Sequence, residues 1–133
     1  MVAIFLKEEL SMKKGRILQV DDDELVRITL GNLLRKHGHH VVSAADGFEA
    51  FEIFRNECDL FDIVLTDLCM PRRDDGLRLC EKIKEISNIP VILISGTFGL
   101  SGDLIVSGGI FDGFIQKPII FDELFLQLER FSL

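Results

Sequence analysis

Basic residues and long apolar runs are both too few in this 133-residue sequence to mark a nucleic-acid-binding or membrane protein. The formal net charge is −7, whereas nucleic acids and anionic membranes bind clustered Lys and Arg. No apolar run reaches the roughly 18 residues of a membrane span, and the first run, residues 2–6, lacks the basic flank of a secretory signal. We therefore expect a cytoplasmic protein that contacts neither nucleic acid nor membrane directly.

Cysteine and proline are scarce as well. The three cysteines, Cys58, Cys69 and Cys80, are odd in number and show no C-x-x-C spacing, so neither a disulfide framework nor a zinc site is indicated. With three prolines, 47% hydrophobic and 28% charged residues, the composition is typical of a globular chain and not of a disordered one. The length suits one domain with a buried core.

Short apolar runs alternate with segments of helical period from residue 16 onward. The apolar runs predict strands over residues 16–20, 40–44, 61–66, 90–95 and 111–115. The segments with one apolar stripe predict helices over residues 24–37, 47–57, 76–87 and 120–131. A fifth helix, between the fourth and fifth strands, should be short and soft, because residues 96–109 contain five glycines.

This alternation predicts a doubly wound α/β domain over residues 15–133. Its five-stranded parallel sheet should be covered on both faces by the crossover helices. The extension at residues 1–14 has two interpretations. It is either a short amphipathic helix that packs on the domain or on a second copy in a homodimer, or a frayed segment upstream of an alternative start at Met12.

Polar residues follow four of the predicted strands. Asp21 and Asp22 come after the first strand, Asp67 after the third, Ser95 after the fourth and Lys117 after the fifth. Because the carboxyl ends of parallel strands meet at one edge of a sheet, beside the switch point in strand order, these side chains should share one pocket.

Carboxylates gathered in one pocket repel each other, and a divalent cation removes that conflict. Oxygen ligands in small number favour Mg²⁺, although Ca²⁺ suits the same chemistry. Lys117 adds a positive charge for an anionic oxygen, and Ser95 adds a hydroxyl. This set suits phosphoryl transfer, in which positioning and charge neutralisation do most of the work. Asp67, the single acid, is the candidate nucleophile, while Asp21 and Asp22 hold the metal.

Four motifs in order, "ILQVDDDELVR", "IVLTDLCMP", "ILISG" and "FIQKP", resemble the receiver domain of two-component response regulators. The resemblance covers residues 15–132, and it is specific because all four motifs occur together. It implies the flavodoxin-like strand order 2-1-3-4-5 with five helices. It also implies a switch protein that takes a phosphoryl group from a sensor histidine kinase or a histidine phosphotransfer protein, and that catalyses only its own phosphorylation and dephosphorylation.

The same resemblance implies a role for each site residue. Asp67 would be the phosphoacceptor and Asp22 a direct Mg²⁺ ligand, with Asp21 acting through metal-bound water. The backbone carbonyl of Cys69 would be a further metal ligand. Lys117 would contact the phosphoryl group, and the Lys117–Pro118 bond would be cis. Ser95 would be the switch hydroxyl, with Phe114 as the aromatic side chain that reorients with it.

The sequence departs from the family pattern in two places. "MPRRDDG" is one residue longer than the usual spacing between its Met-Pro and Asp-Gly pairs, with Arg73 where an apolar residue is common. The glycine-rich stretch before the fifth strand also lacks the usual helix-forming content. The output face is therefore expected to be atypical.

Other polar groups have structural explanations. Asp23 and Glu24 suit the N-cap and first turn of a helix. Gly38 in "HGHH" reads as a helix stop, and this explains the histidine spacing without a metal site. The thiols of Cys58 and Cys80 should be part of the core.

Two rival functions share parts of this chemistry. A haloacid dehalogenase-type phosphatase would carry its nucleophile after the first strand in a D-x-D arrangement and would need a cap domain. A degenerate receiver, which binds partners without phosphorylation, would be expected to lack Asp22, Asp67 or Lys117, and all three are present. Because the sequence stops soon after its last helix, we expect a stand-alone, chemotaxis-type receiver that docks to a partner or passes phosphate along a relay.

Overall fold

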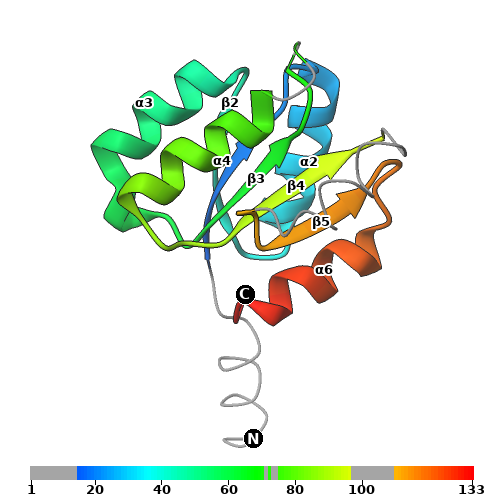
Figure 1. The fold of residues 1–133 in the computed structure, drawn as a ribbon. Helices are drawn as coiled ribbons and strands as arrows, with labels where there is room; N and C mark the ends of the chain where they lie inside the picture. The colour runs from blue at the N-terminus through cyan, green and yellow to red at the C-terminus, as the bar shows by residue number, and fades with distance from the viewer. Residues whose placement is uncertain (1–14, 71, 73–74, 97–109) are drawn as a thin grey trace, which may run out of the picture.

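The computed structural model describes residues 15–70, 72, 75–96 and 110–133, and it shows one parallel sheet between two layers of helices (Figure 1). The strands are β1 (Arg16–Val20), β2 (His40–Ala44), β3 (Ile63–Asp67), β4 (Val91–Ser95) and β5 (Gly113–Gln116). The α-helices in these residues are α2 (Glu24–Lys36), α3 (Gly47–Glu57), α4 (Asp75–Ile86) and α6 (Phe121–Arg130), and a short 3-10 helix, η1, spans Cys58–Leu60.

The five strands are all parallel and lie in the order β2-β1-β3-β4-β5. This confirms the doubly wound α/β class and the predicted strand order. Four α-helices, not five, are found in the part of the chain described. The expected fifth helix falls almost wholly within residues 97–109, and the extension at residues 1–14 is likewise outside the described residues.

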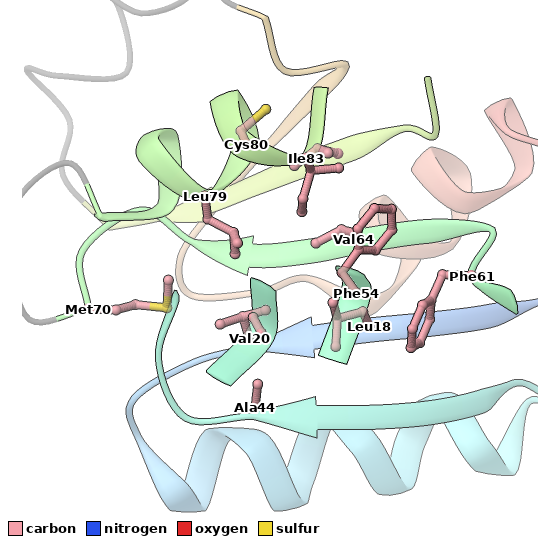
Figure 2. Packing of buried hydrophobic residues seen from close by; sticks show 12 residues of the cluster. Leu18, Val20, Ala44, Phe54, Phe61, Val64, Met70, Leu79, Cys80 and Ile83 are labelled. Carbon is pink, nitrogen blue, oxygen red and sulfur yellow. The ribbon is translucent and has the colours of Figure 1, made fainter. Parts of the chain in front are cut away.

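Alternate residues of each central strand face opposite helix layers, because side chains in a strand point to the two faces in turn. Leu18 and Val20 pack in one core cluster with residues of α3 and α4, and Figure 2 shows this cluster. Ile17 packs in the second cluster with residues of α2 and α6. Every residue of β3 and β4 is buried, as expected for strands covered on both faces.

The core prediction is confirmed for Cys80 and only in part for Cys58. Cys80 is fully buried in the first cluster, and Cys58 is half-buried and packs against it. Burial raises the pKa of the Cys80 thiol to about 12. This thiol is therefore neutral at physiological pH and serves as a small apolar side chain.

Helix ends follow the expected chemistry. The carboxylate of Asp23 is the N-cap of α2 and accepts hydrogen bonds from the backbone N–H groups of Leu25 and Val26. Gly38 ends the helix region with a φ of 94°, which favours glycine. The ring of His37 stacks on Phe125.

Three strands differ from their predicted bounds, and β4 does so only by starting at Val91 instead of residue 90. β3 starts at Ile63 instead of residue 61, and it extends through Asp67. The carboxylate of Asp62, just before it, accepts a hydrogen bond from the backbone N–H of Arg16. β5 starts at Gly113 instead of residue 111. The residue before it, Asp112, uses its carboxylate to accept hydrogen bonds from the Val91 backbone N–H and from Lys84, so it belongs to a junction between elements.

None of the helices in the described residues is both long and apolar enough to cross a membrane.

Candidate functional site

The central strands end at the same edge of the sheet, and their carboxyl ends carry the predicted site residues. Val20 pairs with Thr66, so that the next residues of the two strands, Asp21 and Asp67, are brought side by side. On the other side of β3, Asp67 pairs with Ile94, the residue before Ser95. The parallel register thus gathers residues that are far apart in the sequence at one edge of the sheet (Figure 1).

Three carboxylates form the centre of this edge. One oxygen from each of Asp21, Asp22 and Asp67 can be chosen so that all three lie within 4.8 Å of one another. Asp21 and Asp67 are buried, whereas Asp22 is exposed at the mouth of the cluster. Such a set of hard oxygen donors with one open side fits Mg²⁺, which prefers carboxylate and water oxygens.

Lys117 bridges two of the carboxylates. Its Nζ lies 3.2 Å from an oxygen of Asp21 and 3.2 Å from an oxygen of Asp67. The other Asp21 oxygen accepts a hydrogen bond of 2.9 Å from the backbone N–H of Asp23. Both oxygens of Asp21 therefore already have donors, and its carboxylate is held in one orientation.

The pKa values at the site show which effect dominates at each group. Burial is the largest influence on Asp67 and raises its pKa, with Asp21 adding repulsion and Lys117 opposing both. Burial alone would lower the pKa of Lys117, but attraction to Asp67 and Asp21 outweighs it, and the pKa is raised. Lys117 is therefore firmly protonated. Its attraction does not fully offset the burial and the repulsion from Asp21 that disfavour the ionised form of Asp67. A further cation would relieve this conflict.

The remaining predicted site residues lie around this centre. Ser95 is buried at the end of β4, and its carbonyl accepts a hydrogen bond from the backbone N–H of Lys117. Cys69 is half-buried, two residues beyond Asp67. Phe114 is half-buried on β5, where it pairs with Leu93 further back along the sheet. The predicted cis peptide bond between Lys117 and Pro118 is confirmed.

Several residues that contact the site were missed by sequence reasoning. The guanidinium of Arg27 donates to the carbonyl of Asp21, at 2.7 Å. The hydroxyl of Thr66 donates to the carbonyl of Asp67, at 3.0 Å, and the N–H of Gly76 donates to the carbonyl of Leu68, at 2.7 Å. The sequence offered a signal only for Gly76, whose Asp-Gly pair was recognised as part of a spacing.

An apolar groove of about 330 Å³ lies next to Lys117. Its lining comes from the first half of α2, from the segment between β5 and α6, and from the first residue of α6: Leu25, Val26, Thr29, Leu30, Lys117, Pro118, Ile119 and Phe121. Leu25 and Phe121 are exposed although they are large and apolar. A patch of this kind beside a polar site is typical of a surface that binds another protein.

Comparison with known proteins gives one consistent family. The sequence is 36% identical over 110 residues to the transcriptional regulatory protein YxdJ of Bacillus subtilis, covering 81% of this chain and 46% of that protein. It is 38% identical over 118 residues to the 3',5'-cyclic-nucleotide phosphodiesterase regA of Dictyostelium discoideum, covering 84% of this chain and 14% of that one. The chain thus spans less than half the length of these curated relatives.

Solved structures agree with this result. A response regulator receiver domain from Clostridium thermocellum superposes with a TM-score of 0.81 at 25% identity, covering 89% of this chain and 94% of the other. The chemotaxis response regulator CheY4 of Vibrio cholerae shares the fold at 23% identity, with a TM-score of 0.77 and coverage of 90% and 99%. The model of the response regulator receiver domain matches residues 17–129, and the chain belongs to that family.

Proposed function

We propose that this receiver domain accepts a phosphoryl group on Asp67 in a Mg²⁺-dependent reaction and thereby changes a partner-binding face. The observation that carries the proposal is the arrangement around Asp67. Its carboxylate lies in a cluster with Asp21 and Asp22 and contacts the ammonium of Lys117 at 3.2 Å. A nucleophile, a metal-binding pair and a cation for the transferred group are present together.

In the proposed reaction, a carboxylate oxygen of Asp67 attacks the phosphorus of a phosphohistidine. A P–O bond forms, and the P–N bond to the donor imidazole breaks, with the electron pair staying on the imidazole nitrogen. Lys117 holds the charge that develops on the phosphoryl oxygens. Bound Mg²⁺ would supply charge neutralisation between the carboxylates and the phosphoryl group.

The ligand roles follow from how each carboxylate is already engaged. Asp22 is exposed and suits a direct metal ligand, whereas both oxygens of Asp21 already accept hydrogen bonds, which suits contact through metal-bound water. Asp67 and the backbone carbonyl of Cys69 complete the proposed set. Fewer than six protein ligands leave positions for water, as Mg²⁺ prefers.

Ser95 and Phe114 make up the proposed switch. Phosphorylation of Asp67 adds negative charge and acceptor oxygens at the end of β3. Ser95, on the neighbouring strand, would turn its hydroxyl toward the phosphoryl group and leave space for the half-buried Phe114. The surface around β5 and α6 would then differ between the two states.

We propose a cytoplasmic sensor histidine kinase or histidine phosphotransfer protein as the donor, docked on the apolar groove beside Lys117. Lys117 lines the groove and also contacts Asp21 and Asp67, so that a donor bound there could present its phosphohistidine to Asp67. Substituting Leu25 and Phe121 by Ser should slow transfer from a protein donor without slowing labelling by a small phosphodonor. Equal slowing with both donors would contradict this docking site.

The rival functions fit this site less well. A haloacid dehalogenase-type phosphatase needs its nucleophile after the first strand, whereas Asp67 ends β3. A degenerate receiver needs no Lys117 between two carboxylates, yet that contact is present. We therefore propose that the domain catalyses only its own phosphorylation and dephosphorylation.

The test is labelling with a small phosphodonor such as acetyl phosphate, followed by intact mass measurement. We expect one phosphoryl group on the native protein in Mg²⁺. None is expected in EDTA, in Asp67→Asn or in Asp22→Ala, and circular dichroism should show that both variants remain folded. Undiminished labelling in EDTA, or of Asp67→Asn, would overturn the proposal.

A further inference from the structure

Helix α4 begins against the backbone that carries Asp67. If Gly76 had a Cβ atom, this atom would overlap the carbonyl oxygen of Asp67, and it would lie 2.8 Å from the Cα of Leu68 and 2.9 Å from the carbonyl carbon of Asp67. These neighbours are backbone atoms and not the ends of flexible side chains. Glycine at this position therefore permits the observed distance between the helix and the end of β3.

Hydrogen bonds fix the same stretch of backbone from three directions. The N–H of Gly76 donates to the carbonyl of Leu68 at 2.7 Å, and the N–H of Leu68 donates to the carbonyl of Ile94 on β4 at 3.0 Å. The hydroxyl of Thr66, which is buried, donates to the carbonyl of Asp67 at 3.0 Å. The peptide groups of Asp67 and Leu68 are thus held by β3, β4 and α4 together.

The longer loop of this chain leaves this contact in place. On the far side of Cys69, the N–H of Met70 donates to the carbonyl of Arg72 at 3.2 Å, and the N–H of Asp75 donates to the same carbonyl at 3.3 Å. The N–H of Arg72 donates to the carboxylate of Asp75 at 2.9 Å. Gly76 thus meets the backbone of Asp67 although the sequence from Met70 to Gly76 is one residue longer than the family pattern.

We propose that Gly76 and the hydroxyl of Thr66 are positioning groups for the phosphoryl site. They set the orientation of the Asp67 carboxylate and of the Cys69 carbonyl, two residues further along the same backbone. This inference rests on the proposed function, because it assigns these groups a role toward Mg²⁺ and the phosphoryl group. A Cβ at residue 76 must push α4 away or shift the Asp67 backbone, and small misplacements of reacting groups cost large factors in rate.

The central experiment compares Gly76→Ala with Gly47→Ala. Gly47 is a matched control, because it also lies in the first turn of a helix and its Cβ would meet nothing closer than 3.9 Å. Mg²⁺ affinity is measured by isothermal titration calorimetry, and the phosphorylation rate with acetyl phosphate at saturating Mg²⁺. For Gly76→Ala we expect about a tenfold or greater loss of affinity and a slower rate, whereas Gly47→Ala should match the native protein in both.

A purely structural role for Gly76 predicts a different pattern. In that case Gly76→Ala would lower the melting temperature but would keep native Mg²⁺ affinity and phosphorylation rate while folded, and this result would overturn the proposal.

Thr66→Val keeps the proposal testable if Gly76→Ala does not fold. Valine preserves the shape of the buried side chain and removes the hydrogen bond to the Asp67 carbonyl. Since one such bond has a modest net energy, we expect about a threefold loss of Mg²⁺ affinity. Native affinity in this variant would count against the proposal. Labelling of Asp67→Asn would instead refute the proposed function, and the metal affinities would still report on positioning by Gly76.

Discussion

Charge balance at single residues explains why this site is poised for a cation. Lys117 is shared between Asp21 and Asp67, and Asp22 adds a third carboxylate within 4.8 Å. One ammonium faces three carboxylates, and the pKa of Asp67 is raised, chiefly by burial and further by repulsion from Asp21, against the opposing attraction of Lys117. In the folded protein without metal, the ionised carboxylate of Asp67 is therefore disfavoured by burial and repulsion that the unfolded chain does not impose.

Removing one of these charges should stabilise the metal-free protein. Asp67→Asn keeps the side-chain shape, so we expect a free energy of unfolding at pH 7 in EDTA that is higher by up to about 1 kcal/mol. Added Mg²⁺ should raise the melting temperature of the native protein more than that of Asp67→Asn, because ligands stabilise the state that binds them. Asp59→Asn, in η1 before the start of β3, is the control and should change neither quantity. A metal-free Asp67→Asn that is less stable than the native protein would contradict this prediction.

His39 should make stability depend on pH. The side chain is buried, and its Nδ1 accepts a hydrogen bond from the backbone N–H of Gly15, so this nitrogen carries no proton. Burial lowers the pKa of His39 from 6.5, and repulsion from His37 lowers it further. A lowered pKa means that the unfolded chain binds the proton more readily. The stabilisation is therefore complete above pH 6.5 and is lost as the pH falls toward the folded-state pKa.

Urea unfolding at several pH values checks this prediction. The midpoint should fall as the pH decreases below about 6.5, and His39→Gln should show a weaker dependence. His40→Gln is a matched control, because His40 is exposed and its variant should keep the native slope. If the urea midpoint depended equally on pH in all three proteins, His39 would be ruled out as the source of the pH dependence.

The residues that carry charge at the site were identified from the sequence, because four strand ends each placed at least one polar group at the same edge. Asp21, Asp22, Asp67 and Lys117 meet there as expected. Thr66 was missed because its hydroxyl bonds the backbone carbonyl of the next residue in the same strand, and a strand pattern does not show this bond. Gly76 was missed because its contact depends on how closely α4 approaches β3, a distance that no local sequence pattern encodes.

At the level of elements, sequence periodicity identified five strands and four helices. The predicted start of β5 was wrong because a side chain, and not the backbone, provides the hydrogen-bond acceptor there. Asp112 shows the reason. Residue 112 was predicted within a strand, but its carboxylate accepts from the N–H of Val91 at 2.8 Å and from Lys84 at 2.6 Å. A polar side chain that joins the starts of β4 and β5 to α4 cannot be recognised from apolar alternation alone.

This junction should be a stability determinant that is separate from the phosphoryl site. Asp112→Ala leaves the N–H of the buried Val91 without its acceptor and removes one of the two acceptors of the Lys84 ammonium, the other being the Ile89 carbonyl. We therefore expect a loss of about 2 kcal/mol in the free energy of unfolding. Asp112→Asn retains an acceptor for Val91 and should lose about half as much.

Chemical denaturation measures both losses, and calorimetry should show native Mg²⁺ affinity in both variants because the junction lies at the amino ends of the strands. Reduced affinity in Asp112→Asn would show that the junction and the site are coupled.

Across the whole molecule, the phosphoryl site and the proposed output face are joined by the sheet. Asp67 on β3 pairs with Ile94 on β4, and β4 pairs in turn with β5, which carries Phe114. Two strand-to-strand steps thus connect a charge added at Asp67 to the surface near α6. Both steps involve β4, in which every residue is buried. Close-packed protein interiors have low compressibility and therefore transmit strain.

Binding of a phosphoryl mimic should therefore be detectable at β5. With beryllofluoride and Mg²⁺, we expect hydrogen-exchange rates to change over residues 110–116, because a Ser95 hydroxyl turned toward the mimic would leave space for Phe114 to move. Strand β2 forms the opposite edge of the sheet from β5 and provides an internal control, with smaller changes in exchange rate expected over His40–Ala44. Asp67→Asn should show no change over residues 110–116, since the mimic binds the carboxylate that this variant lacks. An equal response in Asp67→Asn, or unchanged exchange at β5 in the native protein, would mean that this route from site to surface is wrong.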